Sequence, residues 1–408
     1  MSWRTPFTAL LTVPATIALA IAFCAAAIVY LEHRLGTPGW LLPLPPVEAR
    51  VILSIVATAA MTALSLAYSL TLVVFTLAAS SIGPRLLKRF TTERGNQITA
   101  GLLGGTFLFA LTVLGTSGKE PSRIATFIAG LLAAASVVQL IWFVRAVAQS
   151  VSIDDELAKI AGRLRDGLAR LDRHSDGDAD IPPDAAFMPA VAASDTGYLA
   201  GLDRKALVAA AVEGDTILKA NRAEGDYLLP ETVILSAKGA LSEEARQRLA
   251  ETVQQEPARS DTGTVHFSVN LMVEIALRAL SPGVNDTFTA LAVSDMLSGA
   301  LAKVAATDPR PEVLRDPEGR PRVILPGVSF PQLLDTAYHP LRQAAGGNVL
   351  MAEGLARALR RLHGVAGTNG RQAVETHARL LRETLKEGGH LPADLETVIA
   401  LTSDMTRA

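Results

Sequence analysis

The chain has 408 residues, of which 49% are hydrophobic and 19% are charged, and its formal net charge at pH 7 is −2. Residues 1–150 hold ten Lys and Arg against four Asp and Glu, whereas residues 151–408 are net acidic. The acidic half argues against nucleic-acid binding, which needs a basic face. The single cysteine, Cys24, lies in an apolar run, which excludes a disulfide framework and makes thiol catalysis there an unfavourable hypothesis.

Four apolar runs in the first part of the chain are long enough to cross a bilayer as helices. They cover residues 6–31, 51–82, 98–115 and 124–144. The first run is too long for the core of a signal peptide, and other runs follow it, so we expect it to stay in the membrane. We therefore predict a four-helix transmembrane domain over residues 1–149, with the lipid bilayer as its partner.

The second run carries hydroxyl side chains along one side. They recur at steps of three, four or seven residues, which at about 100° per residue places them in an arc roughly 80° wide. They are Ser54, Thr58, Thr62, Ser65, Ser69, Thr76 and Ser80. Small and hydroxyl residues let helices pack closely in lipid, but hydroxyls also line polar pathways. The sequence leaves both interpretations of this hydroxyl face open.

A basic cluster follows the second run. Its members are Arg85, Lys88, Arg89 and Arg94. Short loops rich in Lys and Arg remain on the cytoplasmic side of the membrane. With four spans, both termini and the whole region after residue 150 are then expected in the cytoplasm.

The third and fourth runs carry features typical of helix contacts in lipid. Gly101 and Gly105 form a small-xxx-small pair, which lets another helix approach closely. Gln139 is the one strongly polar residue of the fourth run. Because lipid offers it no partner, we expect a hydrogen bond to a neighbouring helix, with a role in a polar pathway as the alternative.

The remaining chain is predicted to be a cytoplasmic α+β region. Residues 150–190 form an amphipathic helix and an acidic linker, residues 191–240 a small β-rich subdomain with one inserted helix, and residues 241–408 a helical domain. Residues 307–327 are rich in Pro and charge, which predicts a loop. A nearly apolar helix around 268–280 should form the core, with Leu271, Met272, Ile275 and Leu280 buried.

A helix break is expected after that core helix. The pattern stops and restarts at a structural turn made of Ser281, Pro282, Gly283, Asn285 and Asp286. Either Asn285 or Asp286 can cap the helix that follows, because a short side-chain oxygen accepts from N–H groups of the first turn.

Known catalytic and cofactor motifs are missing. The sequence holds no phosphate-binding glycine loop, no dinucleotide fingerprint, no HExxH, no CxxC and no GxSxG. Its seven histidines are scattered singly, without ligand spacing. We therefore expect no enzyme, no cofactor and no metal site.

Four stretches together resemble one family. They are SSIGPRLLKRFTTERGNQ, SDTGYLAGLD, GDYLLPETVIL and ALSPGVNDTFTA. They are similar to the uncharacterised bacterial membrane-protein family named domain of unknown function 2254, over most of the chain. Where that family has proline after the Asn-Asp pair, this chain has Thr287, which should leave the turn intact. The resemblance implies a bacterial inner-membrane protein and carries neither an activity nor functional residues.

Two hypotheses for the function follow. The first is a homo-oligomeric channel or passive transporter, in which each subunit gives its hydroxyl face to a shared path and the cytoplasmic region gates or senses. The second is a membrane-anchored regulatory or scaffold protein whose cytoplasmic domain binds a partner or a small ligand. The ion or ligand cannot be named from the sequence in either case.

The predicted topology can be tested with reporter fusions placed after residues 40, 90, 119 and 200. The basic cluster should hold the fusions at 90 and 200 in the cytoplasm, while those at 40 and 119 should report from the periplasm. A periplasmic signal at 90 or 200 contradicts the topology.

Overall fold

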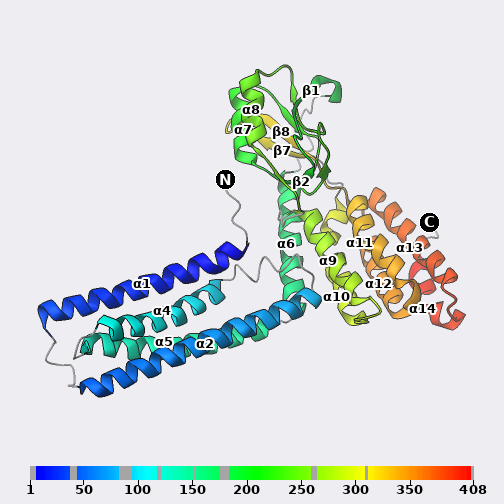
Figure 1. The fold of residues 1–408 in the computed structure, drawn as a ribbon. Coiled ribbons are helices and arrows are strands. Elements are labelled where there is room, and N and C mark those ends of the chain that lie inside the picture. Colours follow the sequence, from blue (N-terminus) through cyan, green and yellow to red (C-terminus); the bar gives the residue numbers. More distant parts are fainter. Residues whose placement is uncertain are drawn as a thin grey trace. The chain divides into compact units, whose positions relative to one another are not determined.

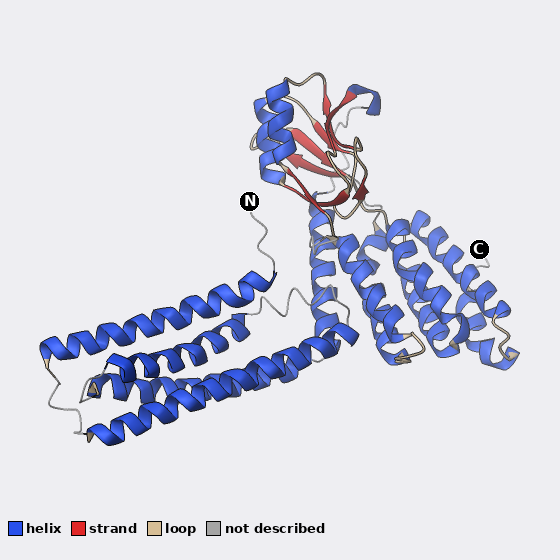
Figure 2. Ribbon diagram, viewed as in Figure 1, coloured by secondary structure: helices blue, strands red, loops and turns tan. Residues whose placement is uncertain are grey.

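The computed structural model describes residues 6–36, 44–81, 94–116, 121–150, 153–174, 183–258, 264–307 and 311–405. The chain divides into two compact units, Met1–Asp155 and Glu156–Ala408. Long helices make up the first unit, and the second combines helices with small sheets (Figure 2). The coarse expectation of a helical membrane part followed by an α+β region is thus confirmed.

Four long helices run side by side in the first unit (Figure 1). They are α1 (Pro6–Leu35), α2 (Pro46–Ser81), α4 (Arg94–Thr116) and α5 (Arg123–Ser150). Each of them includes a segment long and apolar enough to cross a membrane. A further described helix, Thr287–Ala306 in the second unit, also meets that criterion. Helix length and hydropathy therefore do not by themselves fix the number of spans at four.

Helix α4 forms the centre of the first unit, where it packs against α1, α2 and α5. Its two glycines face α1. A Cβ on Gly101 would lie 2.8 Å from Cβ of Ile17, and one on Gly105 would lie 2.5 Å from Cδ1 of Ile21. Both distances are below van der Waals contact, so α1 can lie this close only because these positions carry no side chain.

The end of α1 is joined to the start of α5 by one carboxylate. Glu32 accepts hydrogen bonds from the Ser122 hydroxyl and from the backbone N–H groups of Arg123 and Ile124, the last two at 3.1 and 3.2 Å. The first N–H groups of a helix have no acceptor within it, and negative charge is favourable at that end. Glu32 therefore caps α5 from a position about 90 residues earlier in the chain.

Two small sheets lie in the second unit. The strands are β1 (Phe187–Ala192), β2 (Gly197–Leu202), β3 (Leu218–Ala220), β4 (Tyr227–Leu228), β5 (Val233–Lys238), β6 (Val253–Glu256), β7 (Glu312–Arg315) and β8 (Pro321–Leu325). One sheet has the order β1-β5-β3-β8-β7, and the other has the order β4-β2-β6. Helices α7 (Arg204–Glu213) and α8 (Glu243–Glu251) give Leu207 and Leu249 to the same apolar core as the strands.

The sheets extend well beyond the β-rich segment expected from the sequence. Strand β8 pairs in parallel with β3, with Leu218 opposite Val323, and β7 pairs antiparallel with β8. The prediction of a loop over 307–327 was therefore wrong. Several of the charged residues there, Glu312, Asp316 and Arg322, are buried in ion pairs. The alternate residues Val323 and Leu325 of β8 enter the apolar core. Strand β6 likewise follows directly on α8.

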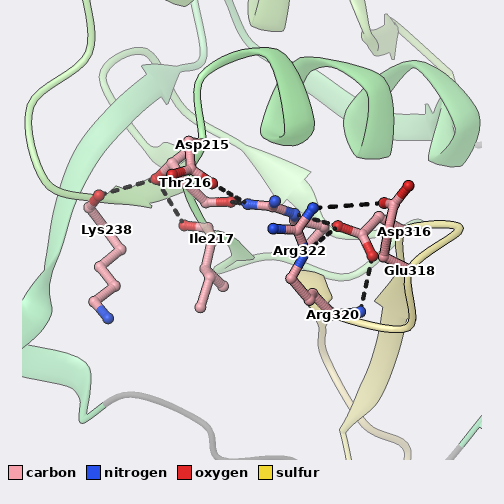
Figure 3. A network of polar contacts seen from close by, with 8 residues as sticks. All are labelled: Asp215, Thr216, Ile217, Lys238, Asp316, Glu318, Arg320 and Arg322. Atoms are coloured by element: carbon pink, nitrogen blue, oxygen red, sulfur yellow. Dashed lines mark hydrogen bonds and ion pairs between the residues drawn. The ribbon is translucent and has the colours of Figure 1, made fainter.

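A network of charged side chains holds the β7–β8 hairpin against the start of β3 (Figure 3). The buried Arg322 guanidinium contacts Asp316 at 2.9 Å and Asp215 at 3.0 Å, and the backbone N–H of Arg320 donates to Asp316 at 2.8 Å. Burial alone would raise the pKa of the Asp316 carboxyl, but these bonds and the two arginine charges hold it below its ordinary value. The buried charges of Arg322 and Asp316 are thus paired with each other and hydrogen-bonded, as buried charges must be.

Helices form the rest of the second unit. They are α6 (Ile153–His174), α9 (Val265–Ala279), α10 (Thr287–Ala306), α11 (Phe330–Ala344), α12 (Val349–Val365), α13 (Thr368–Glu387) and α14 (Pro392–Ser403), with short 3-10 turns at Asp184–Ala186 and Ala345–Gly347. Helix α9 is the expected core helix, since Leu271, Met272 and Ile275 are each at most 2% exposed. Leu280 is only half-buried, because α9 ends there and the chain turns.

Replacing Leu271 by alanine should destabilise the protein by roughly 2–5 kcal/mol, because it leaves a cavity in a packed core. Urea unfolding of the full-length protein in detergent measures this free energy. Leu350→Ala is the matched control, since Leu350 is 42% exposed and its loss should cost less than about 0.5 kcal/mol. Equal losses for the two variants contradict the assignment of α9 as the core.

Replacing Gly105 by alanine should lower stability by about 1–3 kcal/mol, because the new Cβ has to push Ile21 and α1 away. Gly130→Ala adds the same methyl group to α5, where nothing lies within 4 Å. The midpoint of thermal unfolding in detergent should fall for the first variant and stay level or rise for the second. A fall for Gly130→Ala alone contradicts the close packing of α4 on α1.

Candidate functional site

The hydroxyl face of α2 is exposed in the part of the first unit that the structure describes. Every one of its side chains that the structure describes is exposed: Ser54, Thr58, Thr62, Ser65, Ser69 and Thr76. Ser80 lies in α2, but its side chain is outside the described part. Helix α2 packs inward through a different set of residues, Leu53, Val56, Ala57, Ala60, Ala67 and Val74. At about 100° per residue, the centres of the two sets are roughly 170° apart around the helix.

The threonines on this face donate their hydroxyl hydrogens to the helix itself. Thr58 donates to the carbonyl of Ser54 at 2.9 Å, Thr62 to that of Thr58 at 2.8 Å, and Thr76 to that of Val73 at 2.7 Å. Such bonds satisfy the donor without another helix. Each hydroxyl oxygen still has lone pairs available to accept a hydrogen bond. The face therefore needs no partner for its donors, and it offers acceptors to one.

Gln139 lies between helices rather than alone. Its side-chain amide donates to the hydroxyl of Thr99 on α4 at 2.9 Å, and Thr99 is 1% exposed. Seven residues further along α4, the hydroxyl of Thr106 lies 3.0 Å from that of Ser136 in the same α4–α5 contact. This placement follows the expected helix-to-helix hydrogen bond.

The basic cluster falls mostly outside the described residues. Arg85, Lys88 and Arg89 are not described, and Arg94 is the exposed first residue of α4. Because three of its four members lie outside the described residues, the cluster cannot be placed relative to the hydroxyl face.

The turn between α9 and α10 is built as a helix cap. Asp286 accepts from the backbone N–H of Thr289 at 3.1 Å and from its hydroxyl at 2.6 Å. These two bonds hold the pKa of Asp286 below its ordinary value, and the bond from the Thr289 hydroxyl has the larger effect. Asn285 has a φ of 51°, a left-handed conformation that asparagine tolerates better than most residues. The two residues therefore have different structural roles: Asn285 allows the chain to bend, and Asp286 caps α10.

The residues before the Asn-Asp pair complete this turn. The Ser281 carbonyl accepts from the N–H groups of Val284 at 3.1 Å and Asn285 at 2.9 Å. Pro282 and Gly283 lie exposed at its tip. The turn belongs to the second unit, and the hydroxyl face belongs to the first.

Sequence reasoning missed a pocket in the second unit. It has a volume of about 450 Å³, within the range of roughly 300–1,000 Å³ that small-molecule sites occupy. Its walls come from α6, the end of β2 and start of α7, the β3–β4 connection, the start of α9, and β7 with the chain after β8. The lining residues are Gly167, Arg170, Leu202, Arg204, Arg222, Ala223, Glu224, Thr264, Val265, His266, Glu312, Leu325, Pro326 and Val328.

The carboxylates of this pocket already have partners. Glu312 is 3% exposed, and its Oε1 atom lies 2.7 Å from Nη1 of Arg204. Glu224 accepts from the backbone N–H of Leu202 at 3.0 Å. Three arginines outnumber these two glutamates, so the lining carries net positive charge. No spacing in the sequence indicates such a site, because its residues come from six separate stretches of the chain.

Among the described residues, no group of three or more His, Cys, Asp or Glu side chains is placed to hold a metal ion. His363 lies 3.2 Å from the Glu375 carboxylate, and His377 lies 2.8 Å from the Asp335 carboxylate.

Comparison with known proteins agrees with the resemblance seen in the sequence. The family described as "Predicted membrane protein (DUF2254)" matches residues 8–361. Uncharacterized proteins of Mycobacterium bovis and Mycobacterium tuberculosis are each 27% identical over 364 residues, which is 85% of this chain and 68% of the relative. No solved structure matches the chain. The chain therefore belongs to the DUF2254 family of predicted membrane proteins.

Proposed function

We propose that this protein is a homo-oligomeric channel or passive transporter of the bacterial inner membrane, in which copies of α2 line a polar path. The observation that carries the proposal is the exposure of the hydroxyl face on the side of α2 away from its own helix bundle. The hydroxyl face of one subunit cannot surround a path by itself, whereas in a closed ring of subunits these faces would meet around a shared axis.

The length of the hydroxyl face supports this proposal. From Ser54 to Thr76 it extends about 33 Å, at about 1.5 Å per residue. The hydrocarbon core of a bilayer is about 30 Å thick. The face is therefore long enough to offer hydrogen-bonding oxygens at every depth of the membrane, as a pathway for a hydrated solute requires.

The exposed side of α2 is also divided into two kinds of surface. Ile55, Leu66 and Val73 are exposed and lie at about 100–120° on a scale that puts Ser54 at 0°, next to the hydroxyl arc. The exposed residues Met61 and Leu72 lie at the other edge of the hydroxyl arc, at about −20° and 0° on the same scale. Branched apolar side chains suit lipid, whereas an arc of hydroxyls suits a contact with another helix or with water. The division favours a subunit that faces lipid on one flank and its neighbours on the other.

We also propose that α10 belongs to the cytoplasmic unit, which leaves four spans and places both termini in the cytoplasm. Helix α10 packs against α9, α11 and α12. Its Asp295 side chain is 61% exposed and forms an ion pair with Arg361 of α12. A half-exposed ion pair in the middle of a helix is costly in lipid and ordinary in water. Its apolar composition is explained by burial inside the helical core.

The pocket supports a second candidate function, a membrane-anchored regulatory protein whose cytoplasmic unit binds a small ligand. In that case the hydroxyl face serves only to pack copies of α2 together. The two candidates differ in whether water reaches the hydroxyl face in the assembled protein.

Cysteine accessibility tests the proposal. In a Cys24→Ser background, needed because Cys24 is exposed, single cysteines at 58, 62, 65 and 69 should react with a small charged thiol reagent in reconstituted vesicles. A cysteine at 71 is the matched control, since Thr71 lies on the packed side of α2 and is half-buried. Equal protection at all five positions contradicts the path.

A leucine at Thr62 separates a path from simple packing. If α2 lines a path, Thr62→Leu should reduce release of potassium chloride from loaded vesicles while the native mass of the assembly is unchanged. If the face only packs copies together, the same change should reduce that mass.

A further inference from the structure

We infer that the pocket of the second unit is a binding site for a small organic anion, one that carries a phosphate or carboxylate group next to an apolar part. This inference goes beyond the proposed path through the membrane and holds whether or not α2 encloses one. It rests on the shape of the pocket, on the distribution of charge over its lining and on how firmly its walls are held.

The walls of the pocket are fixed by contacts between distant segments. Gly167 of α6 is buried, and a Cβ there would lie 3.1 Å from Cγ2 of Val265, so α6 and α9 touch beside the pocket. The parallel pairing of β3 with β8 holds Leu325 and the chain after it on the opposite side. A pocket formed by packed elements is largely pre-formed, as ligand sites usually are.

One part of the lining is apolar. Leu202, Val265 and Leu325 are each at most 9% exposed, and Pro326 and Val328 continue this surface. Such a wall excludes water and gives no hydrogen bonds, so it fits the hydrocarbon part of a ligand and not its charge.

The other part of the lining favours negative charge. Arg204 is committed to the buried Glu312, which leaves that carboxylate neutralised rather than repelling a ligand. Arg170 of α6 and Arg222 of the β3–β4 connection also line the pocket, and both residues are exposed. Guanidinium groups bind phosphate and carboxylate through two parallel hydrogen bonds.

The start of α9 reinforces this preference. Thr264, Val265 and His266 all line the pocket, and Thr264 caps the 15-residue helix by accepting from Phe267 N–H at 3.2 Å. The N-terminal end of a helix carries partial positive charge and supports anion binding. The arginines and the helix end therefore favour the same sign of charge in the same pocket.

Thermal unfolding of the full-length protein in neutral detergent tests the inference, with phenyl phosphate as the probe. It joins a phosphate to an apolar ring, and it should raise the unfolding midpoint in a saturable manner. Arg222→Ala should weaken this binding by about tenfold or more, because hydrogen bonds between charged groups are the strong ones. Arg222 is exposed, so its loss leaves the core intact.

Two controls make the result specific. Arg246→Ala removes an exposed arginine from α8 that does not line the pocket, and this variant should bind phenyl phosphate like the unaltered protein. Benzyl alcohol keeps the ring but lacks the charge, and it should give no saturable shift. Absence of a shift with phenyl phosphate at millimolar concentration, or equal affinity in Arg222→Ala, overturns the inference. Neither result depends on flux, so failure here leaves the proposed path unaffected.

The same assay identifies the source of the anion. Phosphatidic acid added to the micelles competes with phenyl phosphate if the site takes a lipid headgroup, and the apparent Kd for phenyl phosphate then rises. An unchanged Kd assigns the site to a water-soluble anion.

Discussion

The architecture of the second unit depends on the pairing of β3 with β8. Two strands about 100 residues apart lie side by side, with Lys219 opposite Ile324. Parallel strands require a long crossover, and here the crossover contains α8, β6, α9 and α10. This pairing carries Glu312 to Arg204 and the chain after β8 to the start of α9. The pocket exists because the sheet closes across that distance, and Arg322 with its two carboxylates holds the closure in place.

Local signals in the sequence predicted most helices of this protein. The core helix expected around 268–280 is α9, and Asp286, one of the two expected caps, caps α10. The hairpin of β7 and β8 was missed for a physical reason. Its strands are four and five residues long and are separated by Asp-Pro-Glu-Gly-Arg. Such short, charged strands are stabilised by long-range pairing rather than by their own propensity.

The two candidate sites differ in how far a sequence can reveal them. The hydroxyl face is a periodic pattern on one helix, so its members were all predictable. Its exposure was not, because that depends on which side of α2 meets α4 and α5. That contact is made by apolar residues of α2 such as Leu53, which pack in one cluster with Phe109 of α4 and Ala129 of α5. The pocket has no pattern at all, since Arg170, Arg222 and His266 become neighbours only through tertiary structure.

Glu32 has a consequence for the mechanics of the membrane unit. It holds three donors at the start of α5, two of them backbone groups of Arg123 and Ile124. If α1 slid along the membrane normal by one helical turn, about 5.4 Å, all three donors would lose Glu32 as their acceptor. These hydrogen bonds therefore fix the position of α1 along α5 at one end of the two helices. Any piston-like displacement in this bundle has to move both helices together, whereas a tilt about this contact or a movement of α2 leaves the three hydrogen bonds in place.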